Sequence, residues 1–234
     1  MILCNPQNPA GNIWDRETLA RIGALCKQYD VIVVSDEIHC DLTKPGTEYI
    51  PFASVDDTCR DISVTCIAPT KTFNLAGLQT AAVYAENSIL HHRMWRQLNT
   101  DEVAEPNAFA IQATIAAFQY GEEWLDELRE YVEKNKQYVT EFLQEKIPLI
   151  HPVAGDATYL MWLDCRKITE SGRQFAKFIR KTSGLYVSGG NQYGKGGEGF
   201  LRVNVATSKL VVEDGMQRLY ESVDAWLKEE KISK

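Results

Sequence analysis

The feature that most constrains the fold is the alternation of short apolar runs with helix-forming segments in the first third of the chain. Residues 31–34 form the run Val-Ile-Val-Val without a polar residue, a pattern typical of a strand covered on both faces. Residues 2–4 end another strand, and residues 62–67 and 80–84 are two more candidates for buried strands. Asp15 can cap a helix that runs to about residue 29. Strand, helix and strand at these spacings predict an α/β fold with a parallel sheet.

The chain changes character at about residue 88, where long helical segments begin. We expect one helix to start at Pro106 and a second to cover residues 124–143. Shorter elements follow: strands over 157–164, 185–187 and 200–205, and helices over 171–182 and 211–231. This pattern predicts a smaller α+β domain over residues 126–234, after an α/β domain over residues 1–125.

The charge balance and the apolar runs exclude two classes of partner. The chain has 25 Lys+Arg against 32 Asp+Glu, a net charge of −7, and no basic stripe of the kind that binds nucleic acid. Its apolar runs are strand-sized, far short of the roughly 20 residues that cross a bilayer. No secretory apolar region follows Met1. We therefore expect a cytoplasmic protein without nucleic-acid or membrane partners.

The metal-ligating residue types are scattered. The six cysteines have no close pairing, and the four histidines do not supply the missing ligands. We expect reduced, mostly buried thiols and no metal site.

An acid directly after a predicted strand is a candidate for ligand binding, because ligand sites in open α/β sheets collect at the carboxyl ends of strands. Asp36, followed by Glu37, comes after the run 31–34. Such a pair holds Mg²⁺ in nucleotide hydrolases, but the phosphate loop that they need, GxxxxGKS or GxxxxGKT, is missing from this sequence. Asp36 could instead pair with a protonated ring nitrogen or be a solvated acid. The residues alone leave these two alternatives open.

Lys71 is the second candidate. It follows the predicted strand 62–67 among proline, threonine and apolar residues, and a desolvated lysine amine suits Schiff-base chemistry. The glycine-rich stretch 189–199 is no dinucleotide site, because it leads into a predicted strand rather than a helix.

Four motifs occur in a fixed order: Asn-Pro-Gln-Asn-Pro-Ala-Gly (5–11), Val-Ser-Asp-Glu-Ile-His (34–39), Ala-Pro-Thr-Lys-Thr-Phe-Asn-Leu-Ala-Gly-Leu (68–78) and Phe-Leu-Arg-Val-Asn-Val-Ala-Thr (200–207). Together they resemble the fold-type I, pyridoxal-phosphate-dependent aminotransferases of class I/II, and more closely the cystathionine β-lyase (C–S lyase) branch. The resemblance covers essentially the whole chain, which corresponds to the C-terminal three-fifths of a family member. It implies a remnant of the large-domain sheet that binds pyridoxal phosphate (PLP), followed by the small C-terminal α+β domain.

The resemblance also implies residue roles. Lys71 would bind the cofactor aldehyde covalently and then remove the substrate α-proton. Asp36 would pair with the pyridinium nitrogen and keep it protonated, so that the ring accepts electrons. Asn8 would donate a hydrogen bond to the phenolic oxygen of the cofactor. Thr70 would reach the phosphate.

Three further residues complete the implied site. Ile38 would pack against one ring face, because it lies two residues beyond Asp36 in an expected extended segment. Arg202 would bind the substrate α-carboxylate, a role suited to a bidentate guanidinium. His39 is placed among the cofactor contacts, where many aminotransferases carry tyrosine.

The departures from the transaminase pattern favour the lyase branch. Many aminotransferases carry serine three residues before the lysine and arginine eight after it, where this chain has Ala68 and Gln79. We therefore expect a PLP-dependent carbon–sulfur β-lyase that converts cystathionine or cysteine to pyruvate, ammonia and a thiol. A PLP-dependent aminotransferase is the alternative.

A third alternative belongs to another class. The phosphate-binding turn, the stacking aromatic and the tyrosine contributed across the homodimer come from the N-terminal half of family members and have no counterpart in this sequence. A sheet of about four covered strands would leave apolar edges open. The chain could thus be a non-catalytic fragment or a regulatory module that binds a partner through its sheet edge.

Overall fold

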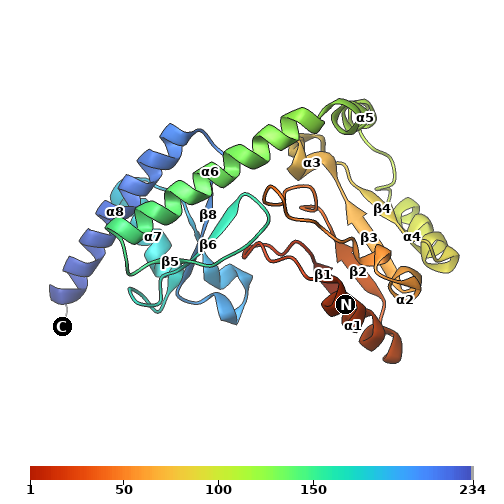
Figure 1. The fold of residues 1–234 in the computed structure, drawn as a ribbon, viewed down its shortest axis with the longest axis horizontal. Helices are drawn as coiled ribbons and strands as arrows, with labels where there is room; N and C mark the ends of the chain where they lie inside the picture. The colour runs from red at the N-terminus through yellow and green to blue at the C-terminus, as the bar shows by residue number, and fades with distance from the viewer. Residues whose placement is uncertain (233–234) are drawn as a thin grey trace. The chain divides into compact units, whose positions relative to one another are not determined.

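The computed structural model describes residues 1–232, which divide into two compact units. Unit 1 combines Met1–Gln7, Asn12–Arg129 and Asp156–Thr158, and unit 2 combines Asn8–Gly11, Glu130–Gly155 and the residues from Tyr159 onward. Figure 1 labels the helices and strands of both.

The sheet of unit 1 contains β1 (Ile2–Cys4), β2 (Val33–Asp36), β3 (Ser63–Ile67) and β4 (Ala82–Tyr84), in that spatial order. The first three strands are parallel, and β4 pairs antiparallel with β3. The predicted α/β class is confirmed, but the sheet is mixed rather than wholly parallel. The expectation that residues 80–84 form a buried strand is wrong, since all three residues of β4 are exposed at the sheet edge. The apolar residues of this segment predict a strand, but they do not indicate whether another element of the fold covers that strand.

One face of this sheet carries α1 (Arg16–Gln28), η1 (Phe52–Ser54) and α2 (Asp57–Asp61). Asp15 caps α1 as predicted: its side chain accepts a 2.7 Å hydrogen bond from the backbone N–H of Thr18. The core between helices and strands is apolar, and each fully buried large side chain contributes about 1.5–3 kcal/mol to folding. Its buried members are Leu3, Leu19, Cys26, Val33, Phe52, Cys59 and Ile62.

Two helical segments lie between β3 and β4 in the chain, α3 (Pro69–Thr72) and η2 (Ala76–Leu78). Two more follow β4, α4 (Ser88–Thr100) and α5 (Ala110–Tyr120). The helix expected to start at Pro106 begins four residues later. The reason is a local cap, because Asn107 Oδ1 accepts from the backbone N–H groups of Phe109 and Ala110.

The helix α6 (Glu122–Lys146) runs from unit 1 into unit 2. Within unit 2 it buries Val132, Asn135, Val139 and Leu143, a spacing that places all four on one helix face.

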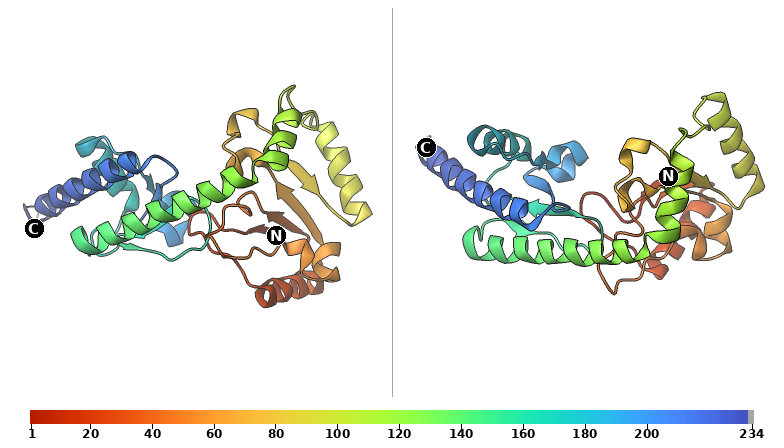
Figure 2. Two further views of the ribbon diagram at one scale, coloured as in Figure 1. Left: turned by 45° about the horizontal axis from the view of Figure 1, so that its top comes forward. Right: turned by 90° about the horizontal axis from the view of Figure 1, so that it is seen from above.

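The sheet of unit 2 is antiparallel, with the strand order β5-β6-β8-β7. Its strands are β5 (His151–Pro152), β6 (Leu160–Asp164), β8 (Phe200–Asn204) and β7 (Ser188–Gly189). The expected strand 185–187 is wrong, because pairing with β8 begins only at Ser188. The helices α7 (Gly172–Ser183) and α8 (Lys209–Ile232) pack against each other in this unit, and η3 (Gly190–Tyr193) and η4 (Lys195–Gly197) precede β8 (Figure 2).

None of the helices within residues 1–232 combines the length and the apolarity that crossing a bilayer requires. All six cysteines are free thiols, of which Cys26, Cys59 and Cys165 are buried. Burial raises the pKa of Cys59 to about 12.

Candidate active site

The strands β2 and β3 place Asp36 and Lys71 at the same end of the unit 1 sheet, where the two strands have their carboxyl ends. Asp36 is the last residue of β2 and lies opposite Cys66 of the parallel neighbour β3. Lys71 lies in α3, which begins two residues after the end of β3. The carboxyl ends of adjacent parallel strands share an edge, with the strands roughly 4.8 Å apart. The topology therefore places both predicted residues where ligands of α/β sheets bind.

Lys71 is held on a short helix rather than in an open loop. Pro69 occupies the first turn of α3, and its carbonyl accepts from the N–H of Phe73 at 2.9 Å. The Thr72 hydroxyl donates to Asp41 Oδ2 at 2.9 Å. The half-buried Lys71 has no hydrogen-bond or ion-pair partner among the residues that the structure describes. Its amine is therefore available to an external group.

The Asp36 carboxylate also lacks a counter-ion among the side chains that the structure describes. It is half-buried, and its Oδ1 accepts a 3.3 Å hydrogen bond from the backbone N–H of Ile38. No cationic side chain of residues 1–229 lies at ion-pair distance from it. A carboxylate in this state favours a cationic group supplied from outside the protein.

The expectation that Ile38 continues an extended strand is wrong. Residues 38–40 form a turn, closed by a 2.9 Å hydrogen bond from the Cys40 N–H to the Glu37 carbonyl. The alternation of faces along a strand therefore does not apply to Ile38. The turn forms because the Asp36 side chain caps the Ile38 N–H as β2 ends.

Glu37, the second acid of the pair, has a structural role. It is buried, and its Oε1 accepts from the Ser35 hydroxyl at 2.8 Å and from the Phe52 N–H at 3.0 Å. Burial raises the pKa of the Glu37 carboxyl, the hydrogen bonds from Ser35 and Phe52 oppose this shift, and the nearby Asp36 charge adds to it. Glu37 thus links β2 to η1.

The two remaining unit 1 candidates flank Asp36 and Lys71 in the chain. Thr70 directly precedes Lys71 and is buried, and its carbonyl accepts from the Leu75 N–H at 3.1 Å. His39 is buried in the turn after β2. Unit 1 therefore carries five of the seven predicted site residues: Asp36, Ile38, His39, Thr70 and Lys71.

Unit 2 carries the other two, and they are in contact. Arg202 Nη1 donates to Asn8 Oδ1 at 3.1 Å, which leaves the Asn8 amide hydrogens for another acceptor. The Arg202 guanidinium also lies over the Tyr193 ring, 5.0 Å from its centroid. These partners orient the guanidinium without neutralising it, so that it can bind a carboxylate.

The sequence did not predict three residues whose hydrogen bonds hold the segments around Asp36 and Lys71: Asn5, Asp41 and Tyr49. The backbone N–H of Asn5 donates to the Asp36 carbonyl at 3.0 Å, and its own carbonyl accepts from the Tyr49 hydroxyl at 2.8 Å. Burial raises the pKa of the Tyr49 hydroxyl, and the nearby Glu37 adds to the shift. Only Asn5 carried a sequence signal, as the first residue of the Asn-Pro motif.

Comparison with known proteins decides the family. The family described as aminotransferase class I and II matches residues 1–219. The chain belongs to this family. The predicted resemblance is thereby confirmed, and the fold-type I fold is shared with solved members.

Cystathionine β-lyases are among the relatives of this chain. The chain is 42% identical over 218 residues to cystathionine β-lyase PatB of Bacillus subtilis (strain 168), covering 93% of the chain and 56% of that protein. It is 31% identical over 226 residues to protein MalY of Escherichia coli (strain K12), covering 96% of the chain and 57% of that protein. The chain thus spans little more than half the length of these relatives.

Two solved structures are similar along nearly the whole chain. The PLP-bound C–S lyase from Staphylococcus hominis has a TM-score of 0.85 and 34% identity, over 95% of this chain and 57% of that one. Cystalysin from Treponema denticola, which contains a pyridoxal 5'-phosphate cofactor, has a TM-score of 0.92 and 28% identity, over 96% and 57%.

Proposed function

We propose that this chain provides the catalytic lysine of a PLP-dependent carbon–sulfur β-lyase, which converts cystathionine or cysteine to pyruvate, ammonia and a thiol. One observation carries the proposal. The Lys71 amine, without a partner among the described residues, and the Asp36 carboxylate, without a cation among them, lie at the carboxyl ends of adjacent strands. The 42% identity to a cystathionine β-lyase supports the substrate class.

The donor set fits pyridoxal phosphate. The free amine of Lys71 suits the cofactor aldehyde, and the Asp36 carboxylate suits a protonated ring nitrogen. The Asn8 amide hydrogens suit the phenolic oxygen, since Asn8 Oδ1 is already occupied by Arg202. Thr70 suits the phosphate. Ile38 and His39 lie on the turn directly after Asp36, and we expect both of them to contact the cofactor ring.

Bound PLP supplies an electron sink for the carbanion that forms when the substrate loses its α-proton. Lys71 Nζ would take that proton from the substrate Cα, acting as a general base. Arg202 would bind the substrate α-carboxylate and set which bond at Cα is broken.

An aminotransferase is the second candidate, because the same residues serve both reactions. An aspartate aminotransferase of Bacillus subtilis (strain 168) is 23% identical over 229 residues. The candidate from another class is a non-catalytic module, which would keep the fold without binding PLP.

We propose further that residues 1–125 belong to the large PLP-binding domain and residues 126–234 to the small domain of a cytoplasmic homodimer. The apolar surface of unit 1 supports an assembly. Apolar side chains of β4 and α5 are exposed, and a cavity of about 500 Å³ opens among them. Its apolar lining includes Ile67, Pro69, Val103, Ile111 and Phe118.

Titration of the purified chain with PLP tests the proposal. We expect the visible absorbance band of lysine-bound PLP in the unaltered chain and no band in Lys71→Ala. Lys44→Ala, an exposed lysine of the same unit, is the matched control and should keep the band. A folded chain without the band would support the non-catalytic module. In a chain that binds PLP, pyruvate release from cystathionine separates the lyase from an aminotransferase, which would instead exchange amino groups with a keto acid.

A further inference from the structure

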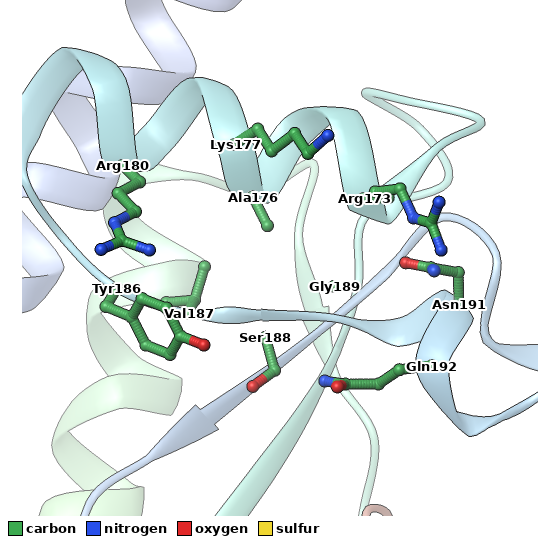
Figure 3. Close-up of a pocket in the computed structure, with 10 residues that line it drawn as sticks. All are labelled: Arg173, Ala176, Lys177, Arg180, Tyr186, Val187, Ser188, Gly189, Asn191 and Gln192. Carbon is green, nitrogen blue, oxygen red and sulfur yellow. The ribbon is translucent and has the colours of Figure 1, made fainter.

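Unit 2 contains a cavity of about 270 Å³ that the proposed active site does not use. The cavity lies between α7 and the segment of residues 186–192 (Figure 3). Three of the lining residues are cationic: Arg173, Lys177 and Arg180. None of the seven predicted site residues lines it.

The sequence of α7 gathers these three charges on one side. Arg173, Lys177 and Arg180 are spaced by four and three residues, which places them on the same helix face. Phe175 and Ile179 lie on the opposite, buried face. Like charges at this spacing repel one another, and a bound anion would relieve this repulsion.

Neutral partners hold the two arginines. With its amide oriented so that both groups are satisfied, Asn191 accepts two 3.0 Å hydrogen bonds from Nε and Nη2 of Arg173. The Arg180 guanidinium lies over the Tyr186 ring, 5.0 Å from its centroid. Figure 3 shows both pairs at the two ends of the cavity. These contacts orient the guanidinium groups but leave their charges uncompensated.

No carboxylate among residues 1–229 neutralises the cluster. Within the described part of the chain, none of Arg173, Lys177 and Arg180 forms an ion pair. Elsewhere in unit 2 exposed arginines do find acids, as in the 2.6 Å contacts of Arg166 with Asp164 and of Arg218 with Asp214. An uncompensated group of three cations is therefore a local exception in a chain with a net charge of −7.

The cavity is also polar at its strand side. Ser188 and Gln192 line it and offer a hydroxyl and an amide. Gly189 permits close packing of β7 on α7, because a Cβ there would lie 2.9 Å from the Arg173 Cα and from the Gly172 carbonyl oxygen. This close packing keeps the polar groups of β7 near the cations of α7.

We propose that this cavity is a binding site for the phosphate group of a small phosphate monoester. Two oriented guanidinium forks and an ammonium group match the charge and the several acceptor oxygens of a phosphate dianion. The cavity volume leaves room for a small organic group beside it. None of the residues proposed to bind PLP lines this cavity.

Calorimetric titration of the full chain with glycerol 3-phosphate, at fixed ionic strength, tests this site, with glycerol as the uncharged control. We expect binding of the phosphate ester only. The double variant Arg173→Gln/Arg180→Gln should bind at least tenfold more weakly, and Lys177→Gln, which alters no described hydrogen bond, at least threefold. Lys181→Gln lies on α7 outside the cavity and should stay within twofold.

Circular dichroism checks that each variant folds. If the double variant does not fold, the loss of affinity expected for Lys177→Gln still tests the proposal. Absence of binding, or equal affinity in Lys177→Gln and Lys181→Gln, overturns the proposal. Equal affinity for citrate overturns the assignment to phosphate. Loss of affinity in Thr70→Val but not in the α7 variants would place the phosphate in unit 1 and also overturn it.

Discussion

The Thr72 hydroxyl donates a 2.9 Å hydrogen bond to Asp41 Oδ2, and this bond connects the helix that carries Lys71 to the segment after β2. Thr72 is fully buried, with an exposed fraction of 0%. The position of the Lys71 amine therefore depends on a residue 30 positions earlier in the chain.

The variant Asp41→Ala should destabilise the chain by about 1–3 kcal/mol, because it leaves the buried Thr72 hydroxyl without its acceptor. PLP affinity should fall as well, since α3 loses an anchor. Urea unfolding and PLP titration measure the two effects. Glu48→Ala, which removes an exposed acid of the same unit, should change neither. An equal loss in both variants would contradict the role of Asp41.

The variant Arg202→Lys should weaken substrate binding about tenfold or more, because lysine lacks the bidentate fork and hydrogen bonds between charged groups are worth about 1.5–3 kcal/mol. PLP binding should fall less than substrate binding, because Lys71 and Asp36 are unaltered, although Asn8 loses its contact with Arg202 Nη1. The spectral response of the PLP-loaded chain to added cystathionine measures the affinity. Arg166→Lys, which alters an exposed pair with Asp164, is the control. Loss of PLP binding in Arg202→Lys would point to a structural role.

Glu37 should make stability fall as pH rises. Its folded-state pKa is raised above the ordinary 4.5 by burial, so the folded state holds the proton more tightly than the unfolded state. The contribution of the protonated Glu37 carboxyl to the free energy of unfolding is complete below pH 4.5, and it is lost as the pH rises through the raised pKa. The variant Glu37→Gln should not lose stability in this way, because glutamine does not titrate. Urea unfolding between about pH 4 and pH 8 should show the wild type losing stability relative to Glu37→Gln. A constant difference would show that the pKa of Glu37 is unshifted.

Two helical glycines should respond oppositely to alanine. In Gly23→Ala the new Cβ would overlap the Cys59 Sγ, and overpacking of this kind costs about 1–3 kcal/mol. In Gly215→Ala the nearest atom is Leu185 Cδ1 at 3.6 Å, an ordinary contact, and the gain in helix propensity should stabilise α8 by about 1 kcal/mol. Thermal unfolding should lower the melting temperature of the first variant and raise that of the second. Stabilisation by Gly23→Ala would contradict the tight packing of α1 on α2.

Local sequence patterns predicted the elements whose boundaries depend on neighbouring residues. The cap at Asp15, the strands around Val33 and Val64 and the helix after Ser171 follow from side-chain shape and from hydrogen bonds within one turn. The order of the four motifs likewise identified the family before any geometry was available. The two strands, unlike the caps, also need distant partners, because β2 pairs with both β1 and β3.

The sequence by itself therefore determined the fold class and the family, and it predicted the pair Asp36 and Lys71. Only the tertiary structure decided that β4 is exposed, that Ile38 lies in a turn, that Asp41 holds Thr72 and that Arg202 contacts Asn8, 194 residues away. The physical reason is that such contacts form when chain folding brings distant segments together. Which of several possible partners a polar side chain then meets is set by packing of the whole unit and not by its neighbours in the sequence.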